Sequence, residues 1–216
     1  MESRDGYAGY RARLVEALRV RGIKDLGVLK AIAETPRHLF VPEALRSRAY
    51  DDVALPIGER QTISQPYTQA RYLETLHLGG TEKVLEVGTG SGYQTALVAA
   101  LAARVFSVEW VPALAQRARQ ALREAGVPNV SVLWGDGTLG WSAYAPFDAV
   151  LVAAGGPEVP PPLLEQLAPG GRLVMPLGAQ GAQTLTLIER SGAGFRRTPL
   201  GDARFVPLVG EHGFDA

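Results

Sequence analysis

Apolar positions in the first third of the chain recur with a helical period. Steps of three and four residues separate Tyr7, Tyr10, Leu14, Ala17 and Leu18. This spacing predicts an amphipathic helix, which Gly22 should end. A second short helix is predicted over residues 25–34, because Asp25 is a good N-cap and Pro36 prevents continuation.

Residues 36–66 lack this period and are rich in turn-forming residues, so an irregular segment is predicted there. Helical spacing returns at residues 68–78, where a third helix is expected. Gly79-Gly80 then leads the chain into a strand.

Short apolar runs dominate the rest of the chain. They predict five strands, at residues 83–87, 104–109, 129–134, 147–154 and 172–177. The run at 147–154 is continuously apolar, which is typical of a strand buried on both faces of a parallel sheet. A short helix from Pro160 through Leu167 should precede the fifth strand. Two late strands, at 184–189 and 204–209, are expected to include an antiparallel pair.

This order of elements predicts a doubly wound α/β fold with a mostly parallel sheet. A ligand should sit across the carboxyl ends of the first strands. We expect a single domain over residues 1–216, in which residues 1–80 form a helical cap with a loop and residues 81–216 form the α/β core.

Composition narrows the possible partners. Lys+Arg and Asp+Glu both total 22, so no net field favours nucleic acid or an anionic membrane. The segment Met1-Glu-Ser-Arg-Asp lacks the apolar core of a signal peptide, and no apolar run is long enough to span a membrane. A cytoplasmic protein without membrane or nucleic-acid partners is therefore expected.

The same composition limits the chemistry. The chain has no cysteine, which excludes a thiol nucleophile, a thiolate metal site and a disulfide. The three histidines, His38, His77 and His212, are scattered without metal-ligand spacing, so no metal is expected.

A glycine turn follows the strand at residues 83–87. The stretch Lys-Val-Leu-Glu-Val-Gly-Thr-Gly-Ser-Gly contains Gly88, Thr89, Gly90 and Gly92, and Glu86 precedes the first glycine by two residues. The spacing G-x-G-x-G differs from the G-x-G-x-x-G of dinucleotide sites. An acid at this turn would repel a pyrophosphate but suits an ammonium group or sugar hydroxyls. The turn therefore indicates S-adenosylmethionine, with no metal.

Two further strand ends complete a predicted mononucleotide site. Glu109 ends the strand at 104–109, where a carboxylate can bind both ribose hydroxyls. Trp110 follows it and could lie along the adenine. The third strand is closed by Gly135-Asp136-Gly137, where Asp136 and Gly137 could bind the exocyclic amine of adenine.

Several segments together resemble the protein-L-isoaspartate O-methyltransferases, a group of class I methyltransferases. The resemblance covers nearly the whole chain and is carried by residues 48–58, Gln61-Thr-Ile-Ser-Gln-Pro-Tyr67, 85–95, 135–137, 145–148 and 204–208. It implies the Rossmann-like methyltransferase fold. It also implies transfer of a methyl group from S-adenosylmethionine to the free α-carboxylate of L-isoaspartyl residues in damaged proteins and peptides, with S-adenosylhomocysteine as the by-product.

The resemblance also assigns substrate-site residues. Ser64 corresponds to the active-site serine of the family and is expected to orient the attacking carboxylate. The surrounding loop residues Thr62, Ile63, Gln65 and Pro66 would dock an extended peptide. The segment Phe205-Val-Pro-Leu208 would form the other wall, with Val206 and Pro207 near the isoaspartyl backbone. Arg60 stands where the family commonly has glycine.

The proposed reaction explains the missing base and nucleophile. A carboxylate with a reference pKa near ~4 is already ionised at neutral pH. The sulfonium of the cofactor activates the methyl group, so the protein has to align the reactants and exclude water.

Alternative interpretations remain open at this point. Ser64 could be a turn or helix-cap serine, and Glu86 and Glu109 could be ordinary strand-end acids. The enzyme could methylate another acceptor, such as a small carboxylic acid or RNA. The chain could also be a catalytically silent module that binds S-adenosylmethionine. A monomer is expected.

Overall fold

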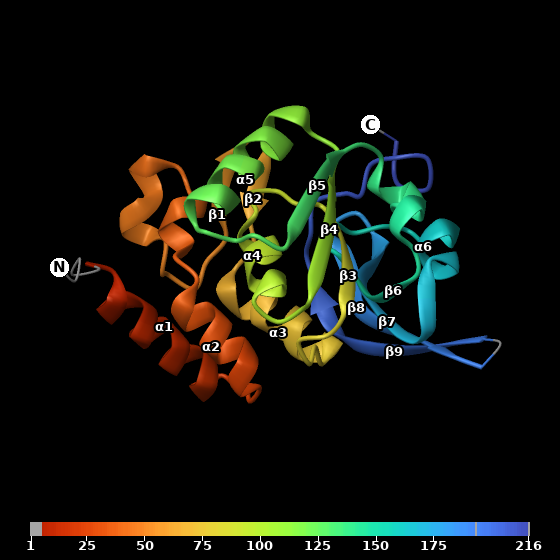
Figure 1. The fold of residues 1–216 in the computed structure, drawn as a ribbon, viewed down its shortest axis with the longest axis horizontal. Helices are drawn as coiled ribbons and strands as arrows, with labels where there is room; N and C mark the ends of the chain where they lie inside the picture. Colours follow the sequence, from red (N-terminus) through yellow and green to blue (C-terminus); the bar gives the residue numbers. More distant parts are fainter. Residues whose placement is uncertain (1–5, 193, 216) are drawn as a thin grey trace.

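A seven-stranded sheet forms the centre of the molecule (Figure 1). The computed structural model describes residues 6–192 and 194–215, so the opening segment 1–5 lies outside it. The strand order is β5-β4-β3-β6-β7-β8-β9, and all pairs from β5 to β7 are parallel. The strands are β3 (Lys83–Val87), β4 (Arg104–Glu109), β5 (Val130–Trp134), β6 (Phe147–Val152), β7 (Leu167–Ala179), β8 (Ala182–Ser191) and β9 (Gly194–Ala203). The predicted doubly wound fold is confirmed.

Two hydrophobic cores cover the two faces of this sheet, because successive side chains of each strand point to opposite sides. On β3, Val84 contributes to the first core and Leu85 to the second. The first core also contains apolar residues of helices α1–α5, whereas the second contains Leu163 of the short helix α6 (Pro161–Glu165). Helix α4 (Tyr93–Ala99) follows β3, and α5 (Pro112–Glu124) follows β4.

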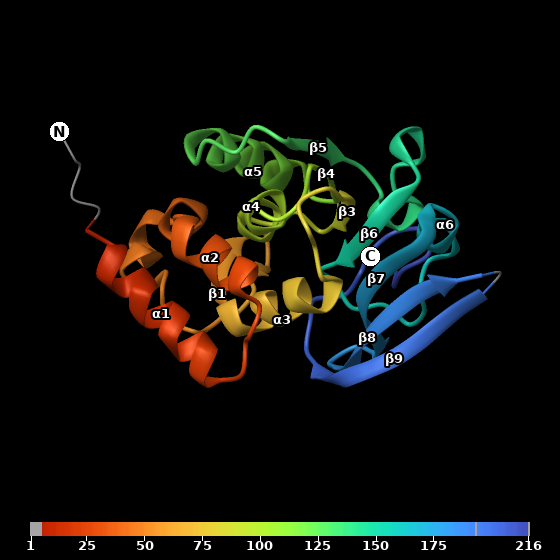
Figure 2. The same ribbon diagram turned by 60° about the horizontal axis from the view of Figure 1, so that its bottom comes forward.

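The predicted N-terminal helices are confirmed. They are α1 (Ala8–Val20), α2 (Leu26–Glu34) and α3 (Pro66–Leu76). Asp25 caps α2, since its Oδ1 accepts a hydrogen bond from the backbone N–H of Val28 at 3.0 Å. Gly22 has a φ of 100° just after α1, a conformation that glycine adopts readily. In Figure 2, α3 lies between α1 and α2 on one side and the sheet on the other.

Residues 36–66 contain more regular structure than predicted. Two 3-10 helices (Arg37–Phe40 and Glu43–Arg48) precede a hairpin of β1 (Leu55–Gly58) and β2 (Gln61–Ile63). These elements are too short to show a period in the sequence.

The turn of this hairpin places two non-glycine residues in the left-handed region. Glu59 and Arg60 have φ values of 52° and 58°, as a tight two-residue hairpin turn requires. Arg60 thus adopts a backbone conformation that favours glycine.

The predicted strand at 204–209 is wrong, although the predicted antiparallel pairing of late strands is confirmed. Strand β8 pairs antiparallel with both β7 and β9, and β9 ends at Ala203. Residues beyond it make only isolated bridges among the described residues, between Gly155 and Pro207 and between Val209 and Phe214. The segment crosses the strand ends instead of extending the sheet. The edge strand β9 is largely exposed and polar, so it shows no apolar run.

Candidate active site

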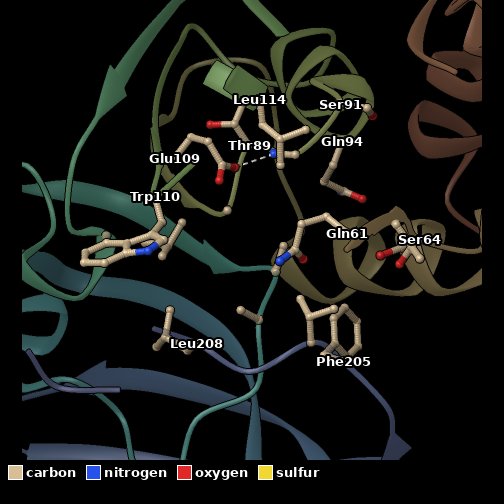
Figure 3. A pocket seen from close by; sticks show the side chains of 18 of the residues that line it. Gln61, Ser64, Thr89, Ser91, Gln94, Glu109, Trp110, Leu114, Phe205 and Leu208 are labelled. Carbon is tan, nitrogen blue, oxygen red and sulfur yellow. Dashed lines mark hydrogen bonds between the residues drawn. The ribbon is translucent and has the colours of Figure 1, made fainter. Parts of the chain in front are cut away.

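A cleft opens at the carboxyl ends of β3, β4 and β6, and encloses about 960 Å³ including its mouth. Its walls include residues 61–64, part of α3, the glycine turn with the adjoining strand ends, and residues 205–209. Figure 3 shows the labelled side chains of these parts around one space, with Glu109 and Trp110 at one side and Ser64 at another. The cleft therefore joins the two halves of the predicted site.

The glycine turn lets the chain reverse direction between β3 and α4. Gly88, Gly90 and Gly92 have φ values of 92°, 56° and 87°. Gly88, Thr89 and Gly90 line the cleft, whereas Gly92 lies behind it as the N-cap of α4. A Cβ at Gly92 would lie 3.3 Å from Cβ of Ala118, so this glycine also allows α4 to approach α5 closely.

Glu109 is the only charged residue that lines the cleft in the described part of the chain. Its carboxylate accepts hydrogen bonds from the backbone N–H of Gly90 at 2.7 Å and of Val111 at 2.9 Å. Burial raises the pKa of Glu109, while these backbone donors act in the opposite direction. Its other lone pairs can accept bonds from a ligand. Trp110 also lines the cleft and is about half exposed.

Glu86 lies one layer below the cleft and does not line it. Its Oε2 accepts hydrogen bonds from the hydroxyls of Thr95 at 2.5 Å and Ser107 at 2.6 Å. The Ser107 hydroxyl also bonds the Thr89 hydroxyl at 2.6 Å, so Glu86 supports the glycine turn indirectly. The structure does not bring this carboxylate to the ligand position that the sequence suggested.

The environment of Glu86 favours its neutral form. The side chain is fully buried, and its Oε1 has no hydrogen-bond partner among the described residues. Burial raises its pKa to about 7, and the nearby Glu109 adds to the rise. The two hydroxyl donors oppose it.

We expect the Glu86→Gln variant to gain stability relative to wild type as pH rises. Between the reference pKa of 4.5 and about 7, the folded state retains a proton that the unfolded state releases. The free energy of unfolding of wild type therefore falls through this window, by up to roughly 3 kcal/mol, and levels off above it. Urea denaturation of both proteins at pH 5 and pH 8 checks this. A stability difference that is the same at both pH values would contradict it.

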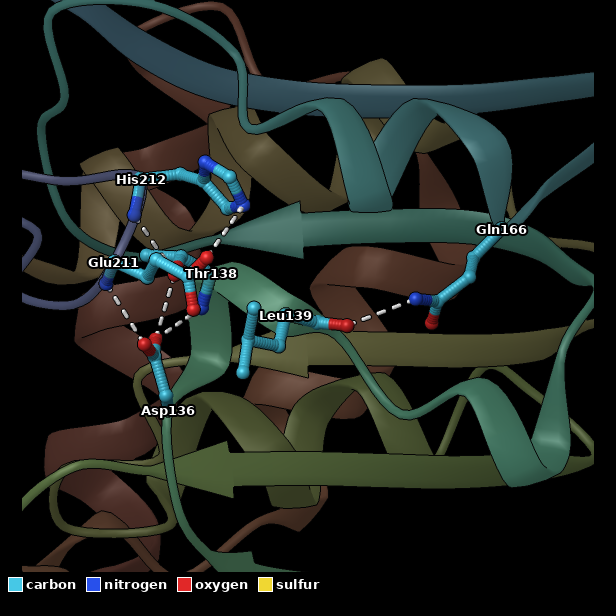
Figure 4. A network of polar contacts seen from close by, with 6 residues as sticks. All are labelled: Asp136, Thr138, Leu139, Gln166, Glu211 and His212. Carbon is cyan, nitrogen blue, oxygen red and sulfur yellow. Dashed lines mark hydrogen bonds and ion pairs between the residues drawn. The ribbon is translucent and has the colours of Figure 1, made fainter.

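Asp136 does not line the cleft either, although the adjacent Gly137 does. The Asp136 carboxylate accepts bonds from the backbone and hydroxyl of Thr138 and, at 2.8 Å, from the backbone N–H of Glu211 (Figure 4). It therefore holds the C-terminal segment against the end of β5. A Cβ at Gly137 would lie 2.4 Å from Cγ1 of Val87, so only glycine fits without a shift.

The predicted substrate loop contributes three residues to the cleft. Thr62, Ile63 and Ser64 line it, whereas Gln65 and Pro66 do not. The Gln65 amide donates to the backbone oxygen and carboxylate of Asp52, at 3.0 and 3.1 Å. Pro66 begins α3.

Asp52 and Arg37 hold this loop from behind. The Asp52 carboxylate also accepts a bond from the backbone N–H of Tyr67 at 2.8 Å, in the first turn of α3. The guanidinium of Arg37 donates to the backbone oxygen of Ser64 at 3.0 Å. Ser64 is thus fixed at its carbonyl, while its side chain lines the cleft.

The opposite wall comes from the segment after β9. The segment Phe205-Val-Pro-Leu208 lines the cleft, and the resemblance had placed the other wall there. The Gln183 amide oxygen accepts a bond from the backbone N–H of Phe205 at 3.0 Å. Gly155 exchanges backbone bonds with Val206 and Leu208, at 2.8 and 2.7 Å.

Sequence reasoning missed other residues of the cleft. These include Gln61, Thr68, Gln69, Tyr72, Gln94 and Leu114. The Nε2 of Gln94 and the hydroxyl of Tyr72 are buried without partners among the described residues. Gln94 stands within the recognised segment 85–95, which was a usable signal. Tyr72 and Leu114 stand on amphipathic helices, where a cleft residue is indistinguishable from a core residue.

Two features are absent from the described residues. No group of acidic or histidine side chains there could hold a metal ion. No helix among residues 6–192 and 194–215 is long and apolar enough to cross a membrane.

Comparison with known proteins gives one family. A sequence model described as protein-L-isoaspartate(D-aspartate) O-methyltransferase matches residues 10–213. Protein-L-isoaspartate O-methyltransferase 1 of Syntrophobacter fumaroxidans is 55% identical over 206 residues, which are 95% of this chain and 96% of that protein. The enzyme of Pseudomonas paraeruginosa is 54% identical over 200 residues, covering 92% and 95% of the two chains.

Solved structures agree with this. A protein-L-isoaspartate O-methyltransferase superposes with a TM-score of 0.85 at 29% identity, over 94% of this chain and 67% of that one. A putative enzyme of the same name from Plasmodium falciparum, in complex with S-adenosyl-L-homocysteine, superposes with a TM-score of 0.80 at 25% identity. The superposition covers 93% of this chain and 98% of that one. Sequence and fold thus point the same way, and the chain belongs to the protein-L-isoaspartate O-methyltransferase family.

Proposed function

We propose that this protein transfers a methyl group from S-adenosylmethionine to the α-carboxylate of L-isoaspartyl residues and thereby starts the repair of damaged proteins. Family membership supports the reaction. The observation that supports this reaction for this chain is that the glycine turn, Glu109 and Ser64 line the same cleft. A methyl donor and a peptide acceptor can meet only if their binding residues share one space.

The residues at the strand ends fit S-adenosylmethionine. Glu109 has lone pairs left for ribose hydroxyls, and the face of Trp110 suits an adenine ring. Gly88 and Gly90 leave backbone free for close approach of the donor. When bound, the sulfonium supplies an activated methyl group.

The chain itself supplies binding, orientation and exclusion of water. We propose that Ser64 donates a hydrogen bond to one oxygen of the substrate carboxylate and so aims the other at the methyl carbon. Thr62 and Ile63 on one side, with Val206 and Pro207 on the other, would clamp the peptide backbone. Gln94 also lines the cleft, and its buried Nε2 has no hydrogen-bond partner among the described residues.

Methyl transfer should be specific for isoaspartate and weakened by Ser64→Ala. With a peptide pair that differs only in L-isoaspartate or L-aspartate, we expect labelled methyl groups on the first peptide alone. Loss of one orienting hydrogen bond should lower kcat/KM about tenfold, equivalent to ~1.4 kcal/mol. Base-labile methyl esters measure the product. Ser91→Ala is a matched control, since Ser91 lines the same cleft but belongs to the glycine turn.

Other outcomes separate the alternatives. Transfer to a small carboxylic acid or RNA, but to neither peptide, would show that the acceptor is not isoaspartate. The proposal that the protein is a methyltransferase would still hold. Cofactor binding without transfer to any acceptor would indicate a silent module.

A further inference from the structure

Arg37 is a fully buried cation behind the substrate loop. Its side chain has 0% of its surface exposed. One guanidinium nitrogen donates to the backbone oxygen of Ser64 at 3.0 Å and another to the amide oxygen of Gln69 at 2.8 Å. The guanidinium carbon lies 4.7 Å from the centre of the Tyr93 ring. Arg37 therefore touches two residues that line the cleft, without lining it itself.

No described carboxylate forms an ion pair with Arg37, although a buried guanidinium usually has one. Asp52 is the acid whose charge acts on it, but its carboxylate is engaged by Arg21, Gln65 and the backbone of Tyr67. Burial lowers the pKa of Arg37 to about 10, so the group stays protonated at neutral pH. A largely unneutralised positive charge thus sits directly behind Ser64.

The described residues that line the cleft offer no positive charge to an acidic substrate. The cleft's only charged lining residue among those described is Glu109, which is negative. A substrate carboxylate that enters must give up water, which is costly for an anion without a counter-charge. Arg37 is the cation that hydrogen-bonds the backbone of Ser64.

From this geometry we propose that Arg37 is a positioning residue that recognises the anionic state of the acceptor: its guanidinium fixes the Ser64 carbonyl and supplies the positive potential for the carboxylate bound at Ser64. The inference rests on the proposed function. It makes the carboxylate's charge, in addition to its shape, a determinant of substrate choice.

Charge recognition of this kind acts mainly on binding. Attack on the sulfonium neutralises the carboxylate, so Arg37 stabilises the bound substrate at least as much as the transition state. In Arg37→Gln, whose amide can still donate to the Ser64 carbonyl, removal of the charge should therefore raise KM and leave kcat within about threefold of wild type. A loop that was merely disordered would instead misplace Ser64 and lower kcat.

The experiment compares two peptides that differ at one group, L-isoaspartate and its α-carboxamide. Their affinities are measured with S-adenosylhomocysteine present, for wild type, Arg37→Gln, Arg37→Met and Arg37→Lys. We expect wild type to prefer the carboxylate by about tenfold or more, Gln and Met variants to lose that preference, and Lys to retain part of it. KM of the isoaspartyl peptide should rise about tenfold in the two neutral variants.

Arg119→Met is the matched control, because Arg119 also donates to a backbone oxygen, that of Val132, away from the cleft. The inference would be overturned if Arg37→Gln and Arg37→Met bound both peptides more weakly by the same factor. It would also be overturned if these variants behaved like Arg119→Met. Wild type that binds both peptides equally would overturn it without any variant, even if Arg37→Met failed to fold. Failure of the proposed function looks different, since wild type would then not methylate the isoaspartyl peptide at all.

Discussion

Replacement of Glu109 by alanine is expected to weaken S-adenosylmethionine binding by a factor of about 10² to 10⁴. A carboxylate that holds two ribose hydroxyls makes two charge-assisted hydrogen bonds, each worth about 1.5–3 kcal/mol. The variant also leaves the backbone N–H groups of Gly90 and Val111 without their acceptor. Calorimetric titration with S-adenosylmethionine and S-adenosylhomocysteine measures the loss directly.

Glu82→Ala is a suitable control for this prediction. The Glu82 carboxylate likewise accepts backbone N–H bonds, from Gly79, Gly80 and Thr81, but lies at the opposite end of β3. Glu82→Ala should therefore leave the affinity for the cofactor unchanged. Similar affinities for Glu109→Ala and wild type would mean that the cofactor does not use this acid.

The second large effect is expected at Gly92, where alanine should lower the free energy of unfolding by about 2–5 kcal/mol. A left-handed backbone costs an L-residue about 1–2 kcal/mol, and crowding in a packed interior adds about 1–3. The crowding arises because the new Cβ would lie 3.3 Å from Cβ of Ala118 and 3.4 Å from Cγ of Leu122. Urea denaturation followed by circular dichroism checks the value.

Gly181 separates the two contributions. It has a φ of 80°, close to the 87° of Gly92, but a Cβ there would meet no atom within 4 Å. Gly181→Ala should therefore cost only the backbone part, about 1–2 kcal/mol. Equal losses at both positions would show that α4 and α5 adjust freely, and the close-packing argument for Gly92 would be wrong.

The sheet could be predicted because its signals are local. Strands β3, β4, β5 and β6 coincide with short apolar runs, and the glycine spacing at 88–92 marks the turn between β3 and α4. Asp25 and Gly22 likewise act through neighbouring backbone, so the helix ends that they mark were predictable.

The remaining features depend on contacts between distant parts of the chain. The burial of Glu86 is set by Thr95 and Ser107, and Asp136 is turned toward Glu211, 75 residues away. Strand-end position alone could not tell an acid facing the ligand from one that supports the wall. Arg37 was missed for the same reason, since its partner Ser64 lies 27 positions further along.

The wall built from residues 205–209 has a consequence for synthesis on the ribosome. The strands and turn that carry Glu109 are complete by residue 109, well before this wall exists. Because chains fold progressively from the N-terminus as they emerge, the donor half can form while the acceptor wall is still inside the exit tunnel. Until that part of the chain emerges, Asp136 lacks the backbone N–H of Glu211 and Gly155 lacks its bridge to Pro207. A nascent chain would thus pass through an interval in which the glycine turn and Glu109 are present but the wall at residues 205–209 is not yet in place.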